Sequence, residues 1–220
     1  MTKNISEHYC PLCDTSVTDL FYQDKRNFYP CSNCSLVFIP AHQFLTLEQE
    51  KSIYDKHNNS PDDPHYRAFL NRLFKPVSER LAPESLGLDF GSGPGPTLSI
   101  MFTEIAHEMN IYDVFYANDT NVLNQKYDFI TASEVVEHLH HPKEELERLW
   151  RCLKPDGILG IMTKRVIDQQ AFSSWHYKND PTHVCFFSIE TFQWLADHWR
   201  ASISFAENDV VLLIKNGSSE

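Results

Sequence analysis

Residues 86–96 read LGLDFGSGPGP, and the rest of the chain is organised around this stretch. A short apolar run ends in Asp89, and glycines then occupy three alternate positions, Gly91, Gly93 and Gly95. Apolar side chains in residues 98–105 recur at the spacing of one helical face. Strand, glycine turn and helix in this order are typical of a nucleotide-binding α/β fold. The glycines let a ligand approach the backbone, and the helix N-terminus presents free N–H groups.

The spacing of the glycines excludes a dinucleotide site. A G-x-G-x-x-G fingerprint needs its last glycine for close packing of helix on strand, and counting from Gly91 that position holds Pro96. The pattern D-x-G-x-G-x-G instead resembles motif I of class I S-adenosylmethionine-dependent methyltransferases, where the loop holds the methionine tail of the cofactor. The resemblance implies S-adenosyl-L-methionine as the cofactor. Its contacts would come from Asp89, Gly91, Ser92, Gly93 and Gly95.

Composition limits the class of protein. The 220 residues suffice for one good-sized domain, or for one domain with a small appendage. The chain has 30 Asp and Glu against 19 Lys and Arg, a net charge of −11, which disfavours nucleic acid and anionic membranes as partners. No signal-peptide pattern opens it, and no apolar stretch is long enough to span a membrane. We therefore expect a cytoplasmic protein with a small-molecule substrate. The oligomeric state stays open.

Two C-x2-C pairs predict a zinc ribbon in residues 1–40. Seventeen residues separate the pairs, within the range typical of structural zinc, and the four ligands would be Cys10, Cys13, Cys31 and Cys34. Four sulfurs complete a tetrahedral shell and leave no open position for catalysis. Two disulfides or four free thiols are the alternatives, and disulfides fit poorly with a chain that lacks a secretion signal.

Residues 41–83 are expected to form a helical linker or lid. Aromatic side chains recur there at helical spacing around a polar loop at residues 58–64. In class I methyltransferases, helices that precede motif I commonly pack over the cofactor and shape the acceptor pocket. By that resemblance, Tyr54, His57 and Tyr66 are candidate contacts.

Residues 84–220 are expected to form the methyltransferase core. A strand near residues 108–112 ends at Asp113, which lies 18 residues past Gly95, where a ribose-binding carboxylate is expected. Only 13 residues separate Asp113 from the next strand, at 127–132, so one strand and helix pair of the family is reduced to a vestige. The adenine contact is therefore open, with Asp119 as a candidate.

The run from Tyr127 to Thr163 resembles motifs IV to VI of the same methyltransferases, including the phrases EVVEHL and LKPDG. Strands at 202–206 and 210–215 resemble the closing hairpin whose last strand is reversed in these enzymes. The expected fold is Rossmann-like α/β. Its sheet is mostly parallel, of the seven-stranded type, with an antiparallel C-terminal strand. Ser133 and Glu134 would lie at the carboxyl edge, where the methyl group should be.

Two hypotheses for activation of the acceptor stay open. In the ubiquinone-pathway O-methyltransferases and in the enzymes that methylate small-RNA ends, E-x-x-E-H binds a divalent cation. By that resemblance, a second metal would be bound by Glu134, Glu137, His138 and His183. Two carboxylates and two imidazoles suit manganese, iron or zinc better than magnesium. The metal-free alternative makes His183 or His176 the general base.

The sequence as a whole predicts a methyltransferase for a small or medium polar acceptor, at oxygen, with carbon still open. One alternative is an enzyme that methylates RNA, which the net charge of −11 disfavours. Another alternative is a non-catalytic module that binds the cofactor or acts through its zinc ribbon. The intact glycine loop and Asp113 argue against that alternative.

Overall fold

The computed structural model describes residues 7–56 and 59–217 of the chain. Its centre is a sheet of six strands: β6 (Leu86–Phe90), β7 (Glu108–Tyr112), β8 (Tyr127–Ser133), β9 (Leu153–Met162), β11 (Ser202–Phe205) and β12 (Val210–Ile214). The spatial order is β11-β12-β9-β8-β6-β7. Strands β7, β6, β8 and β9 are parallel, whereas β12 runs antiparallel to both of its neighbours. The predicted Rossmann-like sheet with one reversed C-terminal strand is confirmed.

The predicted reduction of one strand and helix pair is also confirmed. Between β7 and β8 the chain forms only a bridge between Asp113 and Ala117 and a short 3-10 helix, η2 (Thr120–Asn124). Strand β7 is therefore the edge of the sheet. The cofactor side of the fold consequently lacks the wall that a further strand and helix would supply.

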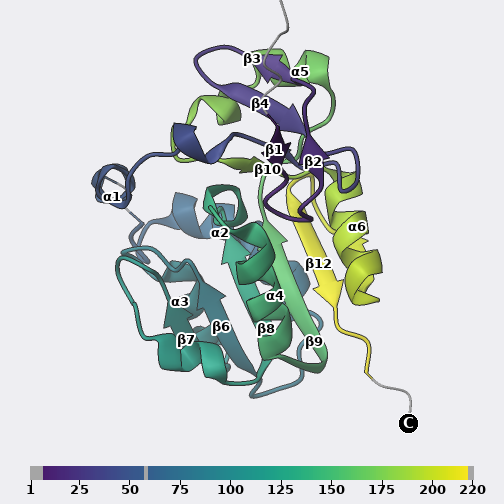
Figure 1. The fold of residues 1–220 in the computed structure, drawn as a ribbon. Coiled ribbons are helices and arrows are strands. Elements are labelled where there is room, and N and C mark those ends of the chain that lie inside the picture. The colour runs from purple at the N-terminus through teal and green to yellow at the C-terminus, as the bar shows by residue number, and fades with distance from the viewer. Residues whose placement is uncertain (1–6, 57–58, 218–220) are drawn as a thin grey trace, which may run out of the picture.

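Helices cover both faces of the sheet (Figure 1). Helices α2 (Pro64–Ser78) and α3 (Thr97–Glu104) pack on one face, and α4 (Pro142–Cys152) and α6 (Ile189–Trp199) on the other. On α3, Leu98, Met101 and Phe102 are buried as their spacing predicts. Ile105 is the exception: it follows the last helical turn and is 47% exposed. Among the residues described here, no helix is both long and apolar enough to cross a membrane.

Side-chain caps fix where several helices begin. Asp63 accepts a hydrogen bond from the His65 N–H at the start of α2, with Pro64 in the first turn. Ser188 and Thr191 form a reciprocal capping box at the start of α6. Helix α1 (Leu47–Tyr54) begins in the same way, at Thr46. Each such cap contributes about 1 kcal/mol.

The N-terminal segment is built into the core. It contains β1 (His8–Tyr9), β2 (Ser16–Val17), β3 (Tyr22–Gln23), β4 (Asn27–Pro30) and β5 (Val37–Phe38). Strand β10 (Cys185–Phe186), from between β9 and α6, pairs with β5 and completes a four-stranded sheet in the order β10-β5-β4-β3. Phe28 of the ribbon packs edge-on against Phe172 and Phe186. The predicted boundary at residue 40 therefore separates segments that share one sheet and one hydrophobic core.

Candidate active site

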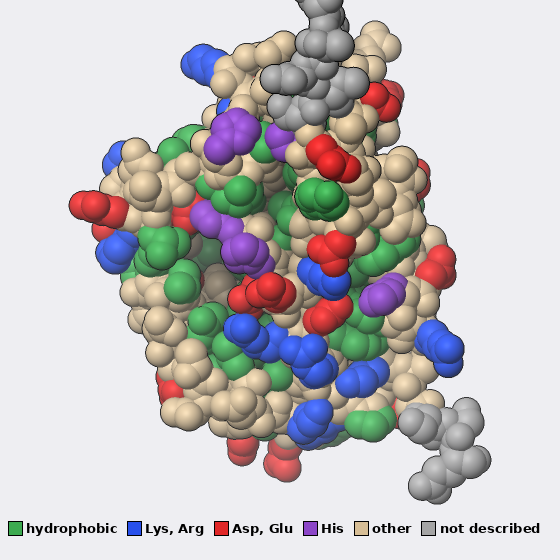
Figure 2. All heavy atoms as spheres, in the orientation of Figure 1, with side chains coloured by type: hydrophobic (Ala, Val, Ile, Leu, Met, Phe, Trp, Pro, Cys, Tyr) green, Lys and Arg blue, Asp and Glu red, His purple; other side chains and the backbone are tan. Residues whose placement is uncertain are grey.

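A cavity of about 1010 Å³ opens at the carboxyl edge of the central sheet, where parallel strands deliver their following loops to one place. Predicted site residues that line it are Gly91, Ser92, Gly93, Asp113, Ser133, Glu134, His138, His176 and His183. On the face drawn in Figure 2, histidine and hydrophobic side chains gather side by side between the surface over α1 and that over α4. Glu134, Glu137, His138 and His183 are called the acid–histidine group below; one cavity thus contains the glycine loop and every member of this group except Glu137, which is buried beside it.

The glycine loop has a backbone that only glycine adopts easily. Gly91 and Gly93 have φ values of +75° and +64°, in the left-handed region. A side chain on Gly91 would also collide with Val135. The Ser92 hydroxyl is buried in this loop and has no hydrogen-bond partner among the described residues. The loop therefore holds an unsatisfied polar group beside open space, as a polar ligand requires.

Gly95 and Asp89 do not line the cavity. A Cβ on Gly95 would collide with the main-chain carbonyl of Asn59, so this glycine admits the linker chain, and Thr97 Oγ1 donates to the same carbonyl at 3.2 Å. Asp89 is 3% exposed and accepts a hydrogen bond from Thr131 Oγ1 at 3.1 Å. Burial raises the pKa of Asp89 to about 7. Both residues therefore support the glycine loop without facing the cavity: Gly95 contacts the linker, and Asp89 is buried against Thr131.

The two predicted acids after β7 have different surroundings. Asp113 lines the cavity, and its oxygens accept hydrogen bonds from the N–H groups of Gly93 at 2.9 Å, Phe115 at 2.8 Å and Tyr116 at 3.1 Å. A carboxylate offers about four acceptor positions, so about one remains for a ligand. Asp119 is exposed, caps η2 by accepting from Asn121 N–H, and is not part of the cavity wall. The structure brings Asp113 to the site but not Asp119.

The ligand atoms of Glu137, His138 and His183 lie within 4.8 Å of one another, and Glu137 is fully buried. Nδ1 of His183 donates to the Tyr177 carbonyl at 2.8 Å, and Nδ1 of His138 donates to the Thr182 carbonyl at 3.2 Å. A carbonyl only accepts, so these bonds fix the tautomer and leave each Nε2 with a lone pair. Burial lowers the pKa of His183 to about 3, which makes this imidazole neutral and a weak base.

Glu134 and Tyr177 join this group. Glu134 has φ +53°, a strained value for a residue with a side chain, and its Oε1 is buried without a partner among the described residues. The Tyr177 hydroxyl donates its single proton to Glu137, and Glu134 Oε2 lies 3.3 Å from the same hydroxyl oxygen. Thr163 Oγ1 donates to the second oxygen of Glu137 at 2.9 Å. Burial raises the pKa of Glu134 to about 8 and that of Glu137 to about 7.

His176 lies apart from that group. It is exposed on the rim of the cavity, and its Nε2 accepts a hydrogen bond from Lys164 Nζ at 3.2 Å. With Nε2 occupied in this way, the ring has no free lone pair for a proton. Of the two predicted general bases, the structure places His183 beside Glu137 and His138 and leaves His176 at the rim. Glu134, also predicted to be catalytic, lines the same cavity.

Helix α1 covers the cavity from one side. Tyr54 packs edge-on against His138 with ring centroids 5.5 Å apart, and Glu50 pairs with His140 at 2.7 Å. Tyr66 on α2 also lines the cavity. Among the predicted linker contacts, Tyr54 and Tyr66 therefore reach the site, while His57 lies outside the described residues.

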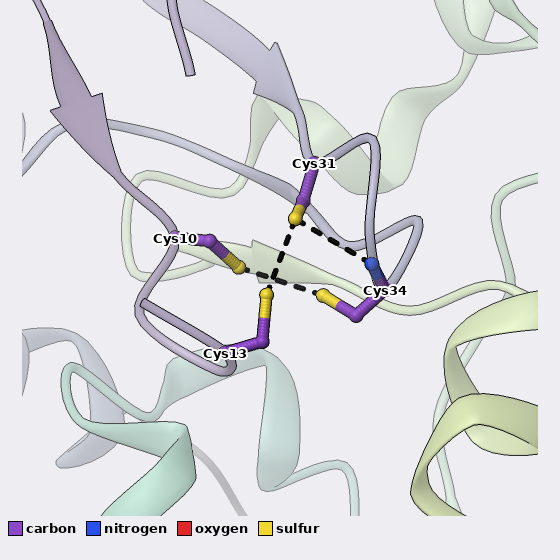
Figure 3. A group of neighbouring side chains, drawn as sticks. All are labelled: Cys10, Cys13, Cys31 and Cys34. Atoms are coloured by element: carbon purple, nitrogen blue, oxygen red, sulfur yellow. Dashed lines mark hydrogen bonds between the residues drawn. The ribbon is translucent and has the colours of Figure 1, made fainter. Parts of the chain in front are cut away.

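The four ribbon cysteines point toward one another (Figure 3). Sulfur separations are 3.5 Å for Cys10–Cys34 and 3.3 Å for Cys13–Cys31, and all four thiols are free. These distances far exceed a disulfide bond of about 2.05 Å and approach the ~3.8 Å expected for two sulfurs on a tetrahedral zinc. A hydrogen bond from Cys34 lowers the pKa of Cys10 to about 6. The donor set thus fits a thiophilic metal such as zinc.

The profile of the family described as methyltransferase domain matches residues 62–199, more than half of the chain. The chain belongs to the methyltransferase domain family. No curated protein matches its sequence.

Solved structures with a similar fold include methyltransferases for small molecules. The 1,6-didemethyltoxoflavin-N1-methyltransferase of Burkholderia thailandensis, with bound 1,6-didemethyltoxoflavin and S-adenosylhomocysteine, is 14% identical with a TM-score of 0.56. The alignment covers 89% of this chain and 98% of that one. Human N-acetylserotonin methyltransferase in complex with S-adenosylmethionine is 13% identical with a TM-score of 0.54, over 69% and 53% of the two chains. The predicted S-adenosylmethionine-dependent methyltransferase is confirmed in family and fold.

One interaction in this methyltransferase lies outside every sequence pattern. Arg26, in the ribbon between β3 and β4, donates to the carbonyls of Lys178, Asp180 at 2.9 Å, Pro181 at 3.4 Å and His183 at 2.8 Å. Asp24 beside it pairs with Lys178 at 2.5 Å. The ribbon therefore holds the loop that carries His183. No motif could have identified Arg26, because its partners are main-chain groups of a segment about 150 residues away.

Replacement of Arg26 should loosen that loop. In an Arg26→Lys variant one ammonium cannot serve four carbonyls in a fork, and unsatisfied part-buried carbonyls should destabilise the fold by about 2–3 kcal/mol. Hydrogen–deuterium exchange should also rise in the peptide spanning residues 176–184. Lys25→Met is the matched control, because Lys25 is exposed, and it should change stability by less than about 0.5 kcal/mol. Unchanged protection of residues 176–184 in Arg26→Lys would contradict the positioning role.

The pKa of Asp89 predicts how stability depends on pH. Because burial raises its native pKa to about 7, the native state holds a proton that the unfolded state releases above about pH 4. Stability should therefore fall as pH rises from about 4 to 7, by up to about 4 kcal/mol. Asp89→Asn removes this titration and keeps an acceptor for Thr131. Urea unfolding across that range should give a flatter curve for Asp89→Asn, whereas Asp62→Asn, in an exposed loop, should follow the parent. Parallel curves for Asp89→Asn and the parent would contradict the assignment.

Proposed function

We propose that this chain is an S-adenosylmethionine-dependent methyltransferase that methylates oxygen on a small or medium polar acceptor, with a divalent cation at Glu137, His138 and His183. The observation that carries the proposal is the pair of histidines whose Nδ1 atoms donate to backbone carbonyls. Their Nε2 lone pairs lie beside a buried carboxylate, in the cavity that also contains the glycine loop. One carboxylate and two imidazoles are a donor set that suits a divalent transition metal.

The residues at the glycine loop fit the methionine and ribose parts of the cofactor. The Ser92 hydroxyl has no hydrogen-bond partner among the described residues, and Gly93 lines the cavity. A polar ligand could bind at both positions. Asp113 orders the loop through Gly93 N–H and keeps about one acceptor position for a ribose hydroxyl. When bound, S-adenosylmethionine supplies an electrophilic methyl group on its sulfonium. Tyr112, Val114 and Phe115, also in the cavity wall, offer apolar surface for adenine in place of the missing strand.

The acid–histidine group fits the task of uncovering a nucleophile. An acceptor hydroxyl must lose its proton as the methyl group arrives. Buried Glu134, with its unpartnered Oε1, can hold that proton, and Tyr177 keeps Glu134 and Glu137 in place. Helix α1 covers one side of the cavity and limits the access of water there, and alignment of acceptor and methyl group would supply most of the rate enhancement.

The two donor sets suit two different ions. In the acid–histidine group, each histidine has its Nδ1 fixed by a carbonyl, the arrangement that usually orients metal-bound imidazole. When bound, a cation such as Mn²⁺, Fe²⁺ or Zn²⁺ would lower the pKa of a coordinated hydroxyl. The four ribbon thiols suit Zn²⁺ in a closed structural site. Zinc in the ribbon would thus stabilise the element that holds His183 through Arg26.

Calorimetry with S-adenosylmethionine tests the cofactor site. Asp113→Ala should weaken binding at least tenfold, because it releases Gly93 N–H and removes the ribose acceptor. Asp119→Ala is the matched control: the same truncation, in an exposed cap outside the cavity, should leave affinity unchanged. No heat with the parent protein at millimolar ligand would refute the enzyme, and equal loss in both variants would refute the placement of the ribose.

Metal analysis of the purified protein tests the cation sites. One equivalent of Zn²⁺ is added first to fill the four thiols, and Mn²⁺ is then added in excess, because zinc in excess would displace manganese. We expect one zinc and one manganese per chain by plasma mass spectrometry. His183→Ala should lose the manganese and keep the zinc, because only its own site is broken. His141→Ala, on the loop before α4, should keep both ions. A parent protein that retains one zinc and no other metal, with full activity, would exclude the metal-assisted reaction.

A further inference from the structure

Lys164 is the single lysine or arginine among the described residues that line the cavity. It follows Thr163, just past the end of β9, and is partly buried. Within residues 7–56 and 59–217 it forms no ion pair with a carboxylate, and its hydrogen bond goes to the neutral ring nitrogen of His176 at 3.2 Å. Two of its three N–H donors are therefore left for another partner.

The carboxylates around the cavity already have partners. Glu50 pairs with His140 at 2.7 Å, and Glu145 pairs with Arg148 at 3.2 Å. Asp113 accepts from three N–H groups, and Asp180 accepts from Thr182 N–H at 2.9 Å and Thr182 Oγ1 at 2.6 Å. Only Glu134 among them keeps a buried oxygen without a described partner; burial raises the pKa of Glu134 and the positive charge of Lys164 partly lowers it, but the two form no ion pair among the described residues. Lys164 therefore faces the cavity with no direct carboxylate partner, and a ligand can reach its free N–H donors.

Lys164 lies on the acceptor side of the cavity. The glycine loop follows β6, and β8 separates β6 from β9 in the sheet. Neighbouring strands are about 4.8 Å apart, so Lys164 and the loop are displaced by ~10 Å across the sheet edge. By contrast, Lys164 is close to the acid–histidine group: its Nζ lies 5.5 Å from the ring centroid of Tyr177, whose hydroxyl donates to Glu137.

We propose that Lys164 and His176 form an anion subsite for a carboxylate or phosphate group carried by the methyl acceptor. The inference rests on the proposed function and names its substrate class, a small hydroxylated acid or phosphate ester. One end of such an acceptor places its hydroxyl at Glu134, which lines the cavity, and the other end pairs its anion with Lys164. An ammonium is a strong point-charge partner for either anion. Because the chain as a whole carries a net charge of −11, an anionic acceptor needs a local cation such as Lys164 to bind in this cavity.

Labelled methyl transfer tests the subsite while the acceptor is still unidentified. The protein is incubated with S-adenosylmethionine carrying a tritiated methyl group and with the small-molecule extract of its source cells. We expect the labelled product to bind an anion-exchange resin at neutral pH. Treatment of the extract with phosphatase beforehand distinguishes the two anions: loss of the product identifies a phosphate ester, and persistence identifies a carboxylate.

Variants of Lys164 give the second readout. With the product identified, Lys164→Met should raise KM for the acceptor about 10- to 100-fold, the loss expected for a charge-assisted hydrogen bond. The kcat should change by less than about threefold, and Lys164→Arg should recover part of the affinity. Lys75→Met, exposed on α2, is the matched control and should behave as the parent.

Different results overturn different claims. A labelled product without an anionic group, or an unchanged KM in Lys164→Met, would overturn the subsite while leaving the methyltransferase intact. A fall in affinity for S-adenosylmethionine itself, by calorimetry, would assign Lys164 to the cofactor carboxylate and overturn the subsite as well. No transfer of label to any compound by the parent protein would overturn the proposed function, and the subsite with it.

Discussion

The fork of hydrogen bonds from Arg26 is the interaction on which the site depends. The segment after β9 must cross from the sheet to α6 and carries four carbonyls that no regular strand or helix satisfies. An arginine can serve several acceptors in one plane, whereas lysine offers a single point. Because Tyr177 and His183 lie on this segment, their positions follow from a contact made by the ribbon. Zinc in the ribbon would then act at a distance, through Arg26 and the pairing of β5 with β10.

Burial sets the charge state of the groups that this scaffold brings together. Glu134 and Glu137 both contact the Tyr177 hydroxyl, and burial raises the pKa of both carboxyl groups. The same burial lowers the pKa of His183 and keeps its Nε2 lone pair available. The neutral imidazole of His183 can bind a cation through its Nε2 lone pair. A carboxyl group of raised pKa can hold a proton. The electrostatics therefore favour ligand roles for the histidines over general-base roles.

The sequence predicted features that depend on local pattern or on strand order. The glycine loop, Asp113 and the acid–histidine phrase all follow parallel strands, so topology alone brings them to one edge. The missed features depend on tertiary pairing. Asp119 is separated from the cavity because the shortened segment turns into η2, and Gly95 meets Asn59 of the linker. Arg26 and Lys164 carry no motif: Arg26 binds main-chain carbonyls, and Lys164 is notable only because it lines the cavity without an ion pair among the described residues. The spacing of residues in the sequence predicts neither the contacts of Arg26 nor the surroundings of Lys164.

The central claim is that one cavity holds the cofactor at the glycine loop and a cation at the acid–histidine group. Diffraction from crystals grown with S-adenosylhomocysteine and Mn²⁺, with data at the manganese absorption edge, tests it directly. We predict S-adenosylhomocysteine against Gly91–Gly93 with its ribose at Asp113. An anomalous peak should lie within coordination distance of Glu137, His138 and His183. Cofactor bound elsewhere, or ordered cofactor with no anomalous peak at these three residues, would contradict the account.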